Sequence, residues 1–69
     1  MKLSIAIPTL NSSEFIEDCI NSVRKISNVD EIIINDDGSN ELDYSILERK
    51  VEKLISSYNL NISLYRNEK

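Results

Sequence analysis

The 69-residue sequence contains no histidine, a single cysteine and a single proline. Without histidine, Ser-His-Asp and Cys-His catalysis are excluded within this chain, and the commonest zinc ligand is missing. The lone cysteine, Cys19, cannot form an internal disulfide, and it fits a reducing compartment. Small domains usually need a disulfide, a metal or a partner to become stable. We therefore expect residues 1–69 to form one small domain of marginal stability.

Glycine also occurs only once, as Gly38, so the sequence has neither a G-x-G-x-x-G turn nor a P-loop. A glycine-lined cradle for a pyrophosphate is therefore not expected. The 8 basic residues are outnumbered by 12 acidic ones and form no patch that would contact a nucleic-acid backbone. The apolar run LSIAI is too short for a signal-peptide core or a membrane span. We expect a soluble, cytoplasmic protein that has no transmembrane segment and binds no nucleic acid.

Two apolar periodicities alternate along the chain and predict the order strand, helix, strand, helix, strand. Residues 3–7 and 31–35 are short apolar runs typical of buried strands, and 61–66 is the third predicted strand. Pro8 cannot donate a ladder hydrogen bond, so we expect it to end the first strand. Apolar residues at helical spacing predict the two helices. They are Phe15, Ile16, Cys19, Ile20, Val23 and Ile26 in the first, and Ile46, Leu47, Val51, Leu54, Ile55 and Tyr58 in the second.

Polar residues mark the predicted ends of these helices. Asn11 is a good N-cap for the first helix, and Glu14 lies three residues on, close to a capping box. Asp43 is a possible cap for the second helix, and Ser39 or Asn40 could cap the turn that follows Gly38. Asn59 is typical of a residue that stops a helix at its C-terminus.

The element order predicts an α/β fold. Two right-handed βαβ units give a parallel sheet with the second strand central and both helices on one face. The other face, where Ala6, Ile33 and Tyr65 would point, is left uncovered, although parallel sheets of the three-layer type are normally covered on both faces. We therefore expect a Rossmann-like, incomplete domain. Its open face could receive a missing C-terminal half or a second copy of the chain.

Two polar segments fall where ligands bind in open parallel sheets, at the C-terminal ends of the strands. PTLN follows the first strand and DDGSN follows the second, so the two loops are predicted neighbours. Thr9 and Asn11 could hydrogen-bond a base or sugar, although Asn11 could equally serve only as a helix cap. Arg66 is the cation expected at this edge. It could approach a diphosphate, but a surface role is the more common one.

The adjacent carboxylates Asp36 and Asp37 end the most apolar stretch of the chain. Carboxylates repel phosphate and only accept hydrogen bonds, so their natural partners are a base N–H or ribose hydroxyls. Gly38 would allow the chain to turn back with positive φ. The alternative is that DDGS is a solvated turn, in which aspartate and glycine serve turn formation alone.

Taken in order, the segments IPTLN, FIEDCINSV and EIIINDDGS resemble the start of the family 2 glycosyltransferases with the GT-A fold. The resemblance covers essentially the whole chain. It implies the nucleotide-recognition portion of an enzyme that transfers a sugar from a nucleotide-sugar donor, a UDP-sugar, to an acceptor. By position, Thr9 matches the residue that lies against the base. Asp36 matches the aspartate that accepts from the uracil N–H, and Asp37 matches its companion near the base and ribose.

The nucleotide-binding residues expected on this basis are Pro8, Thr9, Asn11, Asp36, Asp37 and Arg66. Leu10 stands where the family commonly has an aromatic residue that packs on the base, so an apolar floor replaces base stacking. The family's D-x-D motif, which holds Mg²⁺ or Mn²⁺ and the diphosphate, is expected beyond Lys69 with the catalytic base. We therefore expect no catalytic residue, no metal site and no activity in this chain alone. The alternative is a non-catalytic nucleotide-binding or protein-docking module.

Overall fold

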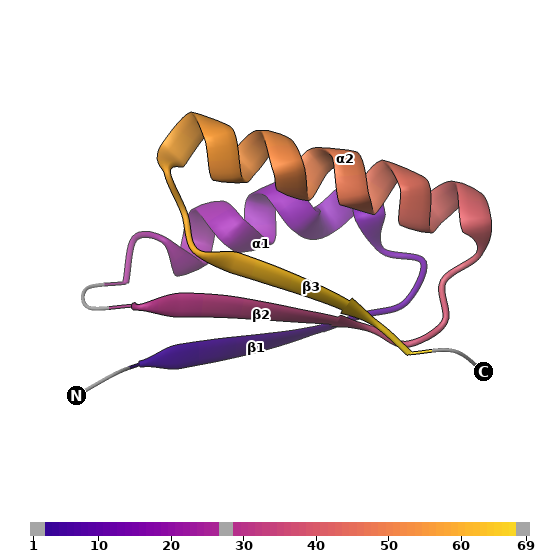
Figure 1. The fold of residues 1–69 in the computed structure, drawn as a ribbon, viewed down its shortest axis with the longest axis horizontal. Coiled ribbons are helices and arrows are strands. Elements are labelled where there is room, and N and C mark those ends of the chain that lie inside the picture. Colours follow the sequence, from indigo (N-terminus) through magenta and orange to yellow (C-terminus); the bar gives the residue numbers. More distant parts are fainter. Residues whose placement is uncertain (1–2, 27–28, 68–69) are drawn as a thin grey trace.

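The computed structural model describes residues 3–26 and 29–67, in which two α-helices lie over one face of a three-stranded sheet (Figure 1). In chain order the elements are β1 (Ser4–Thr9), the 3-10 helix η1 (Ser13–Phe15), α1 (Ile16–Val23), β2 (Glu31–Asp36), α2 (Glu41–Tyr58) and β3 (Ile62–Arg66). The strands are parallel and lie in the order β1-β2-β3. The predicted Rossmann-like α/β order, with the second strand central, is confirmed.

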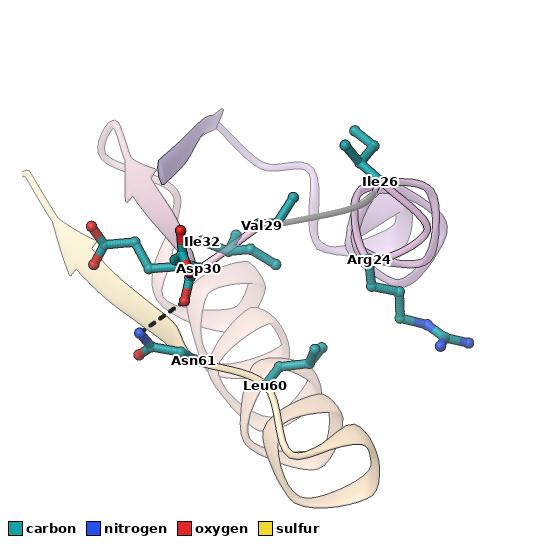
Figure 2. A pocket seen from close by; sticks show the side chains of 8 residues that line it. Arg24, Ile26, Val29, Asp30, Ile32, Leu60 and Asn61 are labelled. Atoms are coloured by element: carbon teal, nitrogen blue, oxygen red, sulfur yellow. Dashed lines mark hydrogen bonds between the residues drawn. The ribbon is translucent and has the colours of Figure 1, made fainter. Parts of the chain in front are cut away.

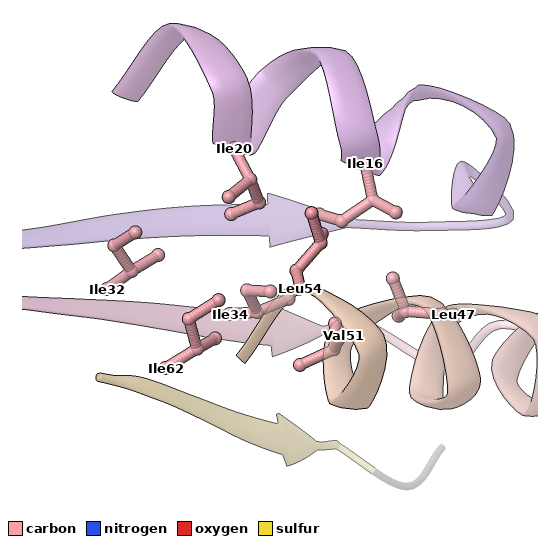
Figure 3. Packing of buried hydrophobic residues seen from close by; sticks show 8 residues of the cluster. All are labelled: Ile16, Ile20, Ile32, Ile34, Leu47, Val51, Leu54 and Ile62. Atoms are coloured by element: carbon pink, nitrogen blue, oxygen red, sulfur yellow. The ribbon is translucent and has the colours of Figure 1, made fainter. Parts of the chain in front are cut away.

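A single hydrophobic core fills the space between the sheet and the helices (Figure 3). In β2, Ile32 and Ile34 are buried while Ile33 between them is only partly buried, because successive strand side chains point to opposite faces. Burial of these branched side chains is the main favourable term in the stability of such a small domain. The buried apolar residues are Ile16, Ile20, Ile32, Ile34, Leu47, Val51, Leu54 and Ile62.

The first helix differs from its prediction at both ends. The α-helix begins at Ile16, after the short 3-10 turn, and ends at Val23. Phe15, which was placed on the apolar stripe, is 62% exposed because it lies in the 3-10 turn and not on the buried face. The predicted cap at Asn11 is wrong: Asn11 has φ 48°, and its side chain bonds to the second loop instead. The short left-handed step is one that asparagine tolerates.

Strands β1 and β2 both extend further at their C-terminal ends than predicted. Pro8 lies within β1, opposite Asn35 of β2, and does not end the strand. β1 is an edge strand, where a missing N–H need not break a ladder bond. β2 continues through Asp36, so this aspartate is the last strand residue and not the first loop residue.

The second helix has well-formed ends. Its N-cap is Asn40, whose side-chain oxygen accepts from the backbone N–H of Asp43 at 2.8 Å. The prediction of Asp43 as the helix cap is therefore wrong, and Asn40, which was predicted only as a possible cap of the turn, has this role. The predicted stop at Asn59 is confirmed, since this residue is left-handed with φ 53° and its N–H donates to the Ile55 carbonyl.

The face of the sheet opposite the helices is open across the described residues (Figure 1). Ala6 is exposed, Ile33 is half-buried and Tyr65 is 56% exposed on this face. Within the described ranges, no helix combines the length and the apolar character needed to cross a membrane.

Candidate functional site

The C-terminal ends of the three strands meet at one edge of the sheet. Register pairs Thr9 of β1 with Asp36 of β2, and Asp36 with Arg66 of β3. The parallel strands therefore bring together three residues that were predicted as site residues from separate parts of the chain. The segments that follow β1 and β2 lie side by side, because the Asp37 N–H donates to the Thr9 carbonyl at 2.8 Å.

Asp36 is completely buried, with 0% of its surface exposed. Its Oδ1 atom accepts from the Thr9 hydroxyl at 2.8 Å and from the Ser39 hydroxyl at 2.5 Å. Its Oδ2 atom accepts from the Ser39 backbone N–H at 2.9 Å. The carboxylate thus joins the end of β1 to the turn after β2, and both of its oxygens are used inside the protein.

These contacts shift the ionisation of Asp36. Burial alone raises the pKa of its carboxyl, but the hydrogen bonds from Ser39 and Thr9, together with the nearby Arg66 guanidinium, outweigh it and bring the pKa below the ordinary 3.8. The side chain is therefore a buried anion at neutral pH, stabilised by donors that face it.

Asn11 and Ser39 form a second connection between the two loops. The Asn11 N–H donates to the Ser39 hydroxyl at 2.7 Å, and the Asn11 side-chain oxygen accepts from the Asn40 N–H at 2.9 Å. Gly38 has φ 90°, which glycine adopts without steric cost, so the chain can reverse here as predicted. The loops behave as one hydrogen-bonded unit, and Asn11 is a loop connector.

Asp37 differs from its neighbour because its side chain is exposed. Leu10, in the adjoining loop, is also exposed, at 46%. Thr9 between these features is buried at 6%, and Pro8 is exposed on the open face of the sheet. The surface that a ligand could reach at this edge therefore combines one free carboxylate with an apolar side chain, carried on a fixed backbone.

Arg66 lies beside the same turn. One guanidinium nitrogen, Nη2, donates to the Ser39 carbonyl at 3.0 Å and to the Glu41 carboxylate at 3.1 Å. The guanidinium also stacks on the Tyr44 ring, 4.3 Å from its centroid. Burial and the Glu48 and Asp36 carboxylates raise the pKa of Tyr44 against the opposing effect of Arg66, so the ring is neutral at physiological pH.

A third connection joins the start of the first helical segment to α2. The Ser13 hydroxyl donates to Asp43 Oδ1 at 2.7 Å, and Lys50 donates to the Ser13 carbonyl at 3.0 Å. Ser13 is buried, so this contact fixes the path of the loop that leaves β1.

Sequence reasoning missed Ser39, Glu41, Tyr44 and Ser13 as parts of this assembly. A signal existed for Ser39 alone: an aspartate followed three residues later by a serine repeats the spacing at which a capping side chain accepts from the backbone. The other contacts join residues far apart in the chain.

A separate cavity of about 270 Å³ lies at the opposite edge of the sheet (Figure 2). Its wall includes Ile26, Val29 and Leu60, and the Asn61 amide donates to the Asp30 carbonyl at 3.2 Å. It lies near the N-terminal ends of β2 and β3, so none of the sequence-predicted site residues lines it.

We call the edge of the sheet formed by Thr9, Asp36, Arg66 and the two adjoining loops the ligand edge. The carboxylates at the ligand edge do not fit a divalent cation. Among residues 3–26 and 29–67, no group of three or more His, Cys, Asp or Glu side chains could hold a metal ion. Both oxygens of Asp36 accept from protein donors, which leaves Asp37 as the free carboxylate of the pair.

In a comparison with known protein families, residues 4–69 match the model described as Glycosyl transferase family 2. Searches of curated proteins and of solved structures find no significant match. The family match covers β1, β2, β3 and both loops of the ligand edge, so it includes every residue of the assembly described above.

Proposed function

This chain belongs to glycosyl transferase family 2, and we propose that it carries the nucleotide-recognition portion of an enzyme that transfers a sugar from a UDP-sugar to an acceptor. Family membership supports glycosyl transfer in general. The uracil nucleotide is the finer part of the proposal, and it rests on the chemistry of the ligand edge. A cytoplasmic location and a requirement of the complete enzyme for Mg²⁺ or Mn²⁺ belong to the same proposal.

The single observation that carries the proposal is the different placement of the two aspartates. Asp36 is buried and acts as the anchor of the turn, whereas Asp37 presents an exposed carboxylate next to the exposed Leu10. We expect Asp37 to accept from a base N–H while Leu10 provides an apolar floor under the base. This reassigns the direct contact with the base from Asp36 to Asp37, because the Asp36 oxygens already have donors.

A carboxylate acceptor favours uracil over cytosine. The N3 atom of uracil carries a hydrogen and can donate to Asp37, whereas N3 of cytosine is an acceptor and would face a negative charge. The Asp37 N–H donates to the Thr9 carbonyl, so the backbone that carries this carboxylate is fixed before ligand binds. In this proposal Pro8, Thr9 and Asn11 shape the first loop, and Thr9 and Asn11 act chiefly through their bonds to the second.

Titration of the 69-residue chain with UDP and CDP, followed by amide-resolved NMR, tests the proposal. We expect shifts at Leu10, Asp37 and Gly38 on adding UDP, and weaker binding of CDP. The variant Asp37→Asn should lose the preference for UDP and most of the affinity. Asp18→Asn, which removes the same charge from an exposed position on α1, is the matched control and should bind as the parent does.

Two results would oppose the proposal. Equal binding of UDP and CDP would remove the role of Asp37 as a base acceptor. Dispersed spectra that no nucleotide changes would favour the alternative, a protein-docking module. This alternative is supported by the exposure of Tyr65 and Ala6 on the open face of the sheet, where a partner protein could dock. Their resonances should then broaden or shift as protein concentration rises or a partner is added.

A further inference from the structure

We infer that Arg66 is a positioning residue, which holds the turn that presents Asp37 and does not bind the phosphates of the nucleotide. The inference rests on the proposed function, and it gives Arg66 a positioning role in place of the direct contact with nucleotide that the sequence suggested. Three features of the Arg66 side chain and its strand support the positioning role, and a fourth, its pairing with Glu41, argues against phosphate binding.

The first feature is the residue to which Arg66 donates. Its Nη2 atom bonds to the Ser39 carbonyl at 3.0 Å. Ser39 donates to the buried Asp36 carboxylate from both its N–H and its hydroxyl, and its hydroxyl also accepts from the Asn11 N–H of the first loop. It is only 3% exposed. Arg66 therefore supplies a donor to the centre of the network that fixes the turn.

The second feature is the stacking on Tyr44. The guanidinium lies 4.3 Å from the ring centroid, which restrains the plane of its donors. Tyr44 itself belongs to the first turn of α2, where its N–H donates to the Asn40 carbonyl at 2.9 Å. The ring thus fixes Arg66 relative to the helix that begins directly after the turn. A lysine would keep the charge but lose the planar fork.

The third feature is the register of β3. Arg66 lies opposite Asp36, and the next residue, Asn67, donates its N–H to the Asp36 carbonyl at 2.7 Å. Arg66, the last residue of β3, therefore holds the end of the turn at Ser39, and Asn67, directly after the strand, holds its start at Asp36. The exposed Asp37 lies between these two attachment points.

The charge of Arg66 is also partly neutralised. The Glu41 carboxylate accepts from Nη2 of Arg66 at 3.1 Å. The Asp36 carboxylate is also close, since the guanidinium helps to lower its pKa. The Glu41 side chain is 91% exposed, so this ion pair contributes little stability by itself. Its effect is to reduce the positive charge that Arg66 can offer to a diphosphate.

The test compares Arg66→Lys with a matched control, Arg24→Lys. Arg24 also stacks on a tyrosine, Tyr58, at 4.0 Å, and donates to a side-chain oxygen, that of Asn21, at 2.9 Å. Uridine, UMP and UDP are titrated by NMR into the parent and both variants. We expect Arg66→Lys to weaken all three ligands by the same factor, about tenfold for a lost charge-assisted hydrogen bond, with Arg24→Lys unchanged. A loss confined to UDP would overturn the inference, because it would mean that Arg66 contacts phosphate.

Hydrogen exchange without ligand gives the second measurement. The Asp37 and Ser39 amides, which donate to Thr9 and Asp36, should exchange faster in Arg66→Lys and at the parental rate in Arg24→Lys. Unchanged exchange in Arg66→Lys would overturn the inference. If the parent chain binds none of the three ligands, the proposed function fails, while the exchange rates still decide whether Arg66 holds the turn.

Discussion

Replacement of Asp36 by asparagine should strongly destabilise the protein, although the change keeps the size of the side chain. The carboxylate accepts three hydrogen bonds in a fully buried position. The single oxygen of asparagine can accept the hydrogen bonds made to only one of the two carboxylate oxygens. The NH₂ group then occupies the place of the other oxygen and faces the Ser39 backbone N–H or the two hydroxyl groups. Two buried donors would be left opposed, and at about 1–2 kcal/mol each the expected loss in free energy of unfolding is roughly 2–4 kcal/mol.

That loss is large for a chain of this size. Domains of 69 residues typically have about 3–10 kcal/mol of total stability. Urea denaturation followed by circular dichroism measures the change as a lower midpoint at a similar slope. Asp37→Asn is the control, because it makes the same substitution one residue later at an exposed site and should stay within about 0.5 kcal/mol of the parent. Equal midpoints for the two variants would refute the reasoning, since it depends on their different burial.

The same carboxylate predicts a dependence of stability on pH. The pKa of Asp36 is lower in the folded protein than its ordinary 3.8, so at intermediate pH the unfolded chain binds more protons. The stabilisation from ionised Asp36 is therefore fully present above 3.8 and is lost as the pH falls through the folded pKa. The gap in stability between the parent and Asp36→Asn should narrow over that acidic range, while Asp37→Asn should follow the parent. A gap that stays constant down to the lowest pH would contradict the assigned shift.

Three further substitutions test other parts of the fold by urea denaturation. Ile34→Ala removes a fully buried core side chain and should cost about 2–5 kcal/mol, whereas Leu42→Ala at an exposed position of α2 should change little. Asn40→Ala removes the N-cap of α2 and should cost about 1 kcal/mol, and Asn40→Asp should restore most of it; equal stability of all three would exclude the capping role. Asn59→Ala forces alanine into a left-handed conformation and should cost about 1 kcal/mol, while Asn59→Gly should be neutral or stabilising, and the reverse order would contradict the C-cap geometry.

Much of the fold could be predicted because it depends on apolar periodicity. The run of isoleucines at 32–34 predicted the central strand and the apolar stripes predicted the two helices, while the right-handed crossovers placed both helices on one face. The ligand edge followed from strand direction alone. The apolar patterns extend over several residues, so misreading one position does not change the predicted order of strands and helices.

The division of roles between Asp36 and Asp37 could not be predicted, because the predicted strand ended one residue too early. With β2 extended to Asp36, the alternation that buries Ile32 and Ile34 also buries Asp36 and leaves Asp37 outside. The failure at Asn11 has a similar origin. A local capping pattern suggested a helix start, whereas the side chain bonds to Asn40, 29 residues away. Local patterns carry no information on such a partner.

The hydrogen bonds that join the end of β1 and its loop to β2, the second loop and α2 are distant in sequence, and this has a consequence for how the protein acquires its site. Thr9 and Asp36 are 27 residues apart, Asn11 and Ser39 are 28 apart, and Ser13 and Asp43 are 30 apart. Each contact requires closure of a chain segment that contains α1, and the entropic cost of closure is offset only once the sheet has formed. A peptide containing either loop alone would therefore lack the geometry of the edge. A ligand that binds only the assembled edge should therefore stabilise the whole chain against unfolding, and by more as its concentration rises.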